Sequence, residues 1–151
     1  MQEPEVAVAR LGGAFADQPH DLLPDAVTRD RRDWVEGLLA RGMDRLSPDD
    51  LDLLVFRAIS TVGSVATFKF ALSRFLAVMI EAPAYADRAT SDAFVILPKL
   101  DHAKFEEWPE GQRRAILDAL ELWADRRLIA ATSQGHDPEA KAMLDWVAAR
   151  R

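Results

Sequence analysis

The polar side chains with the most chemical potential gather in one short segment, Asp101-His102-Ala103-Lys104-Phe105-Glu106-Glu107. His102 and Glu106 stand four residues apart, a spacing that places two metal-ligating side chains on one face of a continuous helix. Trp108-Pro109 follows directly, and a proline at this point favours the start of a new helix. The acids are therefore expected in a turn that leads to the positive end of that helix, and no metal or cofactor is predicted.

Arg74 is a second candidate because it interrupts the most apolar stretch of the chain, residues 65–81. A lone guanidinium among apolar side chains is costly unless it is paired. Glu81 shares its helical face, and an acid from a neighbouring helix is an equal alternative. On a pocket wall, Arg74 would instead bind a carboxylate or a phosphate. The polar groups of such a pocket would be Arg74, Lys99, Asp101 and His102.

Other catalytic patterns are missing from the sequence, which has no glycine-rich phosphate loop, no His-Glu-x-x-His and no Gly-x-Ser-x-Gly. The 151 residues include no cysteine, which excludes disulfides, thiolate metal sites and cysteine nucleophiles. The four tryptophans are expected to fill the core. Trp108 is expected near the surface because it stands at a helix entrance, where an interface role is open to it.

The charge is negative and unevenly distributed. The net charge is −6, and residues 1–50 hold 11 acidic and 6 basic side chains. An acidic chain argues against nucleic acid as a partner and favours a basic protein. The longest strongly apolar uncharged run, residues 75–80, is too short to span a membrane, and residues 1–10 do not resemble a signal peptide. Together with the absence of cysteine, these features predict a cytoplasmic protein.

Helical spacing of apolar residues predicts an all-α protein, with one domain over residues 1–151. Proline and capping signals place helices at Pro24–Ala40, from Ser47 to Val62, at Val65–Glu81, at Asp92–Lys104, at Pro109–Ala131 and at Pro138–Ala149. Ser47, Ser64, Ser91 and Asp137 are the expected capping residues, and Pro98 should kink or divide its helix. The two-residue connection Gly63-Ser64 predicts an antiparallel αα-hairpin. Residues 1–20 are expected to be poorly ordered or to hold one short helix broken at Gly12-Gly13. The predicted architecture is an irregular bundle of about five to six antiparallel helices, with HEAT-like helix pairs as an alternative.

Several segments match a known pattern in order along the chain: Ala14-Phe15-Ala16 with Pro19, residues 46–51, residues 61–64, residues 68–76, and residues 99–109. They resemble a family of uncharacterised bacterial proteins in which a Thr-Trp-Gly turn precedes a helix containing Phe-Leu-Pro-Arg, followed later by a Trp-Pro helix start. The resemblance implies an all-helical, bacterial, cytoplasmic protein without an assigned activity. The matching positions are Thr61, Gly63, Arg74, Lys99, Trp108 and Pro109, whereas Val62 and Ser73 replace the family's tryptophan and proline. The family's cysteines have no counterpart here, so no metal or redox role carries over.

Two hypotheses of function follow from the sequence. The first is a non-enzymatic protein–protein interaction module, such as an acidic partner that neutralises a basic toxin. The second is a small-molecule-binding or catalytic helical bundle with a polar pocket around Arg74 and His102. The sequence leaves the oligomeric state open.

Overall fold

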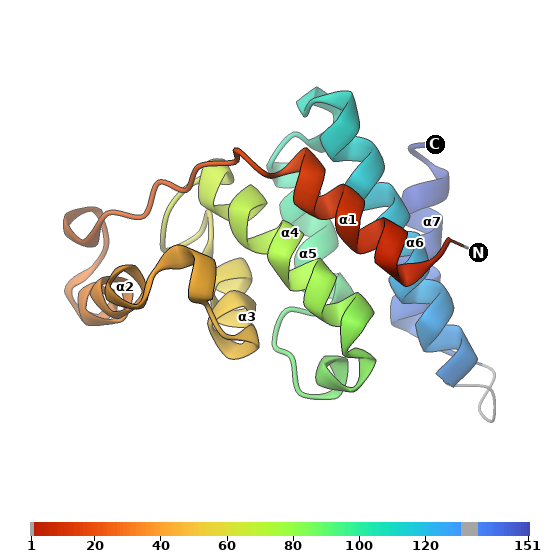
Figure 1. The fold of residues 1–151 in the computed structure, drawn as a ribbon, viewed down its shortest axis with the longest axis horizontal. Helices are drawn as coiled ribbons and strands as arrows, with labels where there is room; N and C mark the ends of the chain where they lie inside the picture. The colour runs from red at the N-terminus through yellow and green to blue at the C-terminus, as the bar shows by residue number, and fades with distance from the viewer. Residues whose placement is uncertain (1, 131–135) are drawn as a thin grey trace.

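The computed structural model describes residues 2–130 and 136–151, and helices dominate both ranges (Figure 1). These ranges hold seven α-helices: α1 (Pro4–Ala14), α2 (Arg29–Arg41), α3 (Pro48–Arg57), α4 (Val65–Glu81), α5 (Ala93–His102), α6 (Glu110–Ala130) and α7 (Pro138–Ala148). Short 3₁₀ segments join them: η1 (Pro24–Ala26), η2 (Met43–Arg45), η3 (Pro83–Asp87) and η4 (Phe105–Glu107). The described residues include no β-strand, so the all-α prediction is confirmed, with more helices than the five to six expected.

Helix α4 is the centre of the bundle. This helix has the predicted bounds, from Val65 to Glu81. It begins where Gly63 adopts a positive φ of 63° and the hydroxyl of Ser64 accepts a hydrogen bond from the N–H of Ala66. Most of its side chains are buried, as expected for a helix that is apolar nearly all round.

The helices pack as a compact bundle. Helix α4 contacts α1, α3 and α6, and α6 also contacts α1 and α7 (Figure 1). In a HEAT-like stack each helix pair would contact only its neighbours along the chain. The contact between α1 and α6, which are far apart in sequence, therefore favours the bundle.

The helix predicted to reach Val62 ends at Arg57. The side chains of Ser60 and Thr61 both donate to the carbonyl of Arg57 at 3.2 Å, which offers the backbone an alternative to the next helical turn. Residues 58–64 therefore form an irregular connection, longer than the predicted two-residue link between these helices.

Helix α1 corrects the prediction for the N-terminal segment. It is one short helix, but it continues through Gly12-Gly13 to Ala14. Ala7 and Leu11 are buried in the core, and this packing outweighs the low helix propensity of the two glycines. The segment predicted as a helix over Pro24–Ala40 divides into η1 and α2.

Helix α5 differs from its prediction at both Pro98 and its N-terminus. The helix runs without a break through Pro98 to His102. Asp92, and not Ser91, caps it by accepting from the N–H of Val95 at 3.0 Å. Ser91 is buried and its N–H donates to the carboxylate of Asp52 at 2.7 Å.

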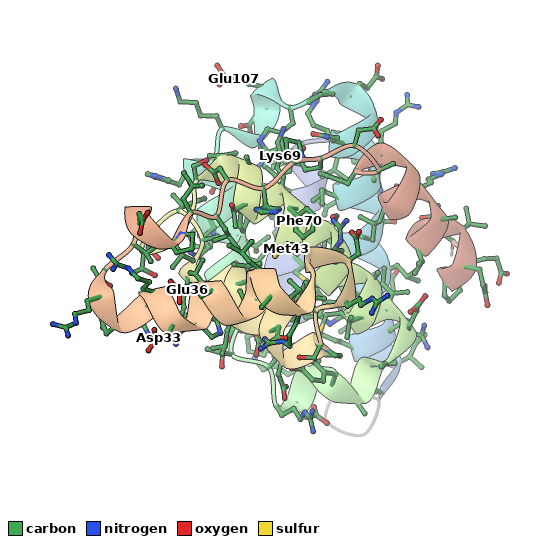
Figure 2. The ribbon with its side chains drawn as sticks, turned by 60° about the vertical axis from the view of Figure 1, so that its left-hand side comes forward. Asp33, Glu36, Met43, Lys69, Phe70 and Glu107 are labelled. Atoms are coloured by element: carbon green, nitrogen blue, oxygen red, sulfur yellow. The ribbon has the colours of Figure 1, made fainter. Side chains whose placement is uncertain are left out.

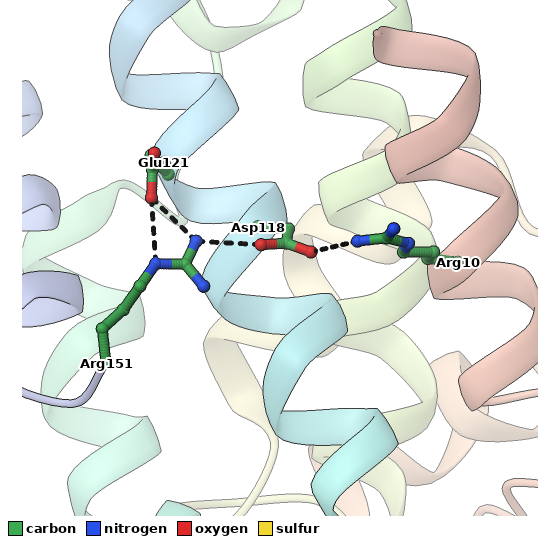
Figure 3. Close-up of polar contacts among 4 residues, drawn as sticks. All are labelled: Arg10, Asp118, Glu121 and Arg151. Atoms are coloured by element: carbon green, nitrogen blue, oxygen red, sulfur yellow. Dashed lines mark hydrogen bonds and ion pairs between the residues drawn. The ribbon is translucent and has the colours of Figure 1, made fainter. Parts of the chain in front are cut away.

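Helix α6 ends at Ala130, and the predicted last residue, Ala131, lies outside the described residues. Ion pairs tie this helix to both ends of the chain (Figure 3). Asp118 on α6 lies 2.7 Å from Arg10 of α1 and 2.8 Å from Arg151, which also contacts Glu121 at 2.7 Å.

No helix within the described ranges combines the length and apolar character needed to cross a bilayer.

Candidate functional site

The structure places Arg74 at the edge of the bundle. Its guanidinium lies over the ring of Phe70, 3.6 Å from the ring centroid, and donates to the Phe70 carbonyl at 3.1 Å. The paired acid is Asp44 of η2 at 3.6 Å, which fits the expected acid from another segment rather than Glu81. Burial lowers the pKa of Arg74, and Asp44 opposes that shift. Arg74 also lines a hollow of about 220 Å³ against α1.

Lys99 and Trp108 both donate to backbone carbonyls. The Lys99 Nζ lies 2.6 Å from the oxygen of Ala58, and burial lowers the pKa of the lysine. The Trp108 Nε1 donates to Ala103 at 3.0 Å. Trp108 is only 5% exposed, so the expected surface position was wrong. Its ring lies under Lys69, whose Nζ is 4.6 Å from the ring centroid.

Asp101 serves as a contact between α5 and α7. Its carboxylate accepts from Trp146 Nε1 at 3.1 Å and from Arg150 at 2.7 Å. Arg150 also pairs with Glu106 at 3.2 Å. His102 is the last residue of α5 and is exposed. Because the helix ends there, His102 and Glu106 do not share a helical face.

These placements do not form one pocket around Arg74 and His102, because each polar group has separate neighbours. Within residues 2–130 and 136–151, no group of three or more histidine, aspartate or glutamate side chains is arranged to hold a metal ion.

The segment between α1 and α3 differs most from its predicted structure. We call residues 15–41 the arm.

The arm is fixed to the N-terminal end of α4 by Asp21. Its carboxylate accepts hydrogen bonds from the N–H of Ser64 at 2.9 Å and from the hydroxyls of Ser64 and Thr67. The N–H of Asp21 donates in return to the Thr67 hydroxyl at 2.9 Å. Burial acts to raise the pKa of Asp21, but the hydrogen bonds from Ser64 and Thr67 outweigh it, so the pKa lies below its usual value.

Neighbouring residues strengthen this attachment. The ring of His20 meets Phe70 of α4 edge to face, with centroids 5.4 Å apart. Gln18 and Lys69 both contact Gln112 of α6, at 3.3 Å and 3.0 Å. Figure 2 shows α2 across the front of the molecule, with Lys69 and Phe70 on the helix behind it.

The outer side of the arm combines an apolar side chain with carboxylates. Leu23 is 61% exposed, whereas its neighbour Leu22 is buried. Asp17, Asp25 and the α2 acids are exposed, and none makes an ion pair within the described part of the chain. Figure 2 labels two of these α2 acids, Asp33 and Glu36. We call Asp17, Leu23, Asp25, Asp33 and Glu36 the arm surface.

The basic side chains are largely used within the protein. Arg10, Arg41, Arg127, Arg150 and Arg151 pair with carboxylates, while Lys99, Arg113 and Arg126 donate to backbone carbonyls. Arg29, Arg31 and Arg32 are the exception within the arm, and all three belong to the first turn of α2. Apart from these three arginines, the internal pairing of cations leaves the arm acids available to a cation from outside.

Leu23 and Asp21 were not predicted from the sequence as functional residues. The pair Leu22-Leu23 in a polar stretch was the available signal, because successive side chains of an extended segment point to opposite sides. Asp21 had no local signal, since its partners are more than forty residues away. No protein-family model, curated protein or solved structure matches this chain, so its function is inferred from these contacts.

Proposed function

We propose that this chain is a non-enzymatic protein–protein interaction module whose arm surface binds a basic partner protein. The observation that carries the proposal is Leu23, 61% exposed and flanked by carboxylates that make no ion pair among the described residues. An apolar contact ringed by polar groups is the usual anatomy of a protein interface. A partner that buries Leu23 and places lysines or arginines near Asp25 and Asp33 would complete it.

Electrostatics supports the same partner class. The net charge of −6 attracts a basic protein over a distance and raises its association rate. The arginines in the first turn of α2 would repel a basic group at that end of the helix, so they favour one orientation of the partner. A basic toxin neutralised by this chain belongs to this class.

The test begins with capture by the immobilised protein from a lysate of the source organism at low salt. The captured partner is then purified and its affinity measured by calorimetry at two salt concentrations. We expect Leu23→Ser, and separately the combination Asp25→Asn, Asp33→Asn and Glu36→Gln, to weaken binding at least about tenfold. Added salt should weaken the wild type more than the neutralised variant.

Matched controls lie elsewhere on the surface. Ile129 is 59% exposed, so Ile129→Ser removes as much exposed apolar side chain outside the arm. Glu81→Gln, Asp87→Asn and Glu107→Gln remove the same charge from exposed positions of other segments. Equal losses in the arm variants and the controls, or a partner that is not basic, would contradict the proposal.

A further inference from the structure

A second surface lies at the other end of α4, between η3 and the last turns of α6. A groove of about 510 Å³ is lined on one side by Pro83, Ala84 and Ala86 and on the other by Trp123 and Arg126. Its volume falls within the range of small-molecule sites. No residue of the arm surface lines it.

Trp123 lines this groove and carries a buried hydrogen-bond donor without an acceptor in the described part of the chain. The residue is 2% exposed, and its Nε1 has no acceptor among the described residues. A buried donor without a partner is destabilising, and such groups are rare in native proteins. The indoles of Trp108 and Trp146, in contrast, donate to Ala103 and Asp101. An acceptor supplied by a ligand would remove the cost at Trp123.

Arg126 brings an unpaired positive charge to the same groove. One of its nitrogens donates to the carbonyl of Ile80 at 2.7 Å, and Arg126 forms no ion pair among the described residues. The adjacent Arg127 differs, because Asp137 and Glu139 pair with it at 3.0 Å and 2.8 Å. A guanidinium carries five N–H groups, so Arg126 retains donors for a ligand.

The two donors can serve one anion. Trp123 and Arg126 are three residues apart on α6 and therefore share a face of the helix. Asp87 and Asp137 also line the groove, and Asp137 is already neutralised by Arg127. Arg126 supplies one unpaired positive charge, and the carboxylate of Asp87 would repel a second negative charge on the ligand. A singly charged anion is therefore favoured over a phosphate dianion.

The apolar walls define the rest of the ligand. A second hollow of about 400 Å³ adjoins the groove and shares Pro83, Arg126 and Ala130 with it. Leu122 and Ile129 line it further. Arg126 thus lies where two apolar hollows meet. We propose that this groove binds a small amphipathic monocarboxylate, with its carboxylate on Arg126 and the Trp123 N–H and its apolar chain along the η3 wall.

The test uses sodium octanoate as the probe and octanamide as its neutral counterpart. The chain has four tryptophans, so ¹H–¹⁵N spectra resolve a small set of indole N–H signals, and Trp123→Phe identifies that of Trp123. We expect octanoate to move the Trp123 signal the most. Arg126→Met should weaken octanoate binding at least about tenfold and leave octanamide binding unchanged.

Arg113→Met is the matched control, since Arg113 also lies on α6 and donates to a backbone carbonyl but does not line the groove. If Arg126→Met fails to fold, Ala84→Asp replaces it, because a new carboxylate on the exposed η3 wall should repel octanoate alone. The proposal is overturned if octanoate leaves the Trp123 signal in place. Equal binding of the acid and the amide, or equal effects of the Arg126 and Arg113 variants, would overturn it as well.

Discussion

Replacing Asp21 tests how the arm is held. Its carboxylate accepts from the Ser64 N–H and from the hydroxyls of Ser64 and Thr67, and these residues lie at the start of α4. Asp21→Ala removes all three acceptor contacts, whereas Asp21→Asn retains one oxygen. The arm should loosen in both variants, and more in the alanine variant.

The size of the effect follows from the contacts. A hydrogen bond to a charged group contributes about 1.5–3 kcal/mol when it is buried. Asp21 is exposed, so water replaces part of each lost contact, and the value for an exposed cap, about 1 kcal/mol, is the better guide. We therefore expect Asp21→Ala to lower the free energy of unfolding by about 1–2 kcal/mol. In a domain of this size that lowers the melting temperature by about 2–8 °C.

The effect should depend on pH in one direction. The folded pKa of Asp21 lies below the usual value of 3.8, so the folded protein binds a proton less readily than the unfolded chain. Its stabilisation is fully present above pH 3.8 and is lost as the pH falls through the folded pKa. The stability difference between wild type and Asp21→Asn should therefore stay constant from neutral pH to about pH 4 and shrink below it.

Urea denaturation at several pH values measures the stability, and hydrogen exchange of residues 17–25 measures the loosening. Asp17→Asn is the control, because Asp17 lies in the same arm and makes no ion pair or hydrogen bond among the described residues. An Asp21→Ala variant as stable as Asp17→Asn would refute the assignment. So would an exchange increase spread evenly over α6 and α7.

Three further substitutions test other elements. Gly63→Ala should lower the free energy of unfolding, measured by urea denaturation, by about 2–4 kcal/mol. Gly63 has a φ of +63°, and a Cβ there would lie 2.5 Å from the Thr67 hydroxyl oxygen. A loss below about 1 kcal/mol would contradict this geometry. Pro98→Ala should stabilise by about 1–3 kcal/mol, since it restores an N–H to an exposed position inside α5; a lower melting temperature would show that Pro98 is needed. Arg151→Ala should cost less than about 1 kcal/mol, an effect that high salt abolishes, because its pairs with Asp118 and Glu121 are partly exposed; a salt-independent loss would contradict the prediction.

The sequence predicted elements whose signals are local. Helix α4 follows from an apolar run with Ser64 before it and Pro83 after it. The caps at Ser47 and Asp137 formed as predicted, each accepting from the backbone N–H three residues later, at 3.1 Å. A capping side chain needs only its own neighbours, which is why the sequence was sufficient for these features.

Prediction from neighbouring residues failed where contacts between residues distant in sequence determine the position of a side chain. Trp108 stands at a helix entrance, yet the rings of Phe15 and Phe68 each meet it edge to face at 6.4 Å, and the turn at Lys104 brings a carbonyl to its indole. Those ring contacts join the first residue of the arm and helix α4 to the residue that precedes Pro109 and α6. The arm depends in the same way on Asp21 reaching α4, and periodicity along the chain carries no information about that contact.

The arm surface and the groove are joined by one rigid element. Helix α4 holds Asp21 at its first turn and offers the Ile80 carbonyl to Arg126 at its last. Its 17 residues span about 26 Å. Energetic coupling between two sites requires a structural element that can adopt two arrangements. Helix α4 is buried and packed against α1, α3 and α6, which favours a single arrangement. We therefore expect Arg126→Met to leave the affinity of the arm surface for a basic partner unchanged, and a loss measured by calorimetry would mean that α4 moves on binding.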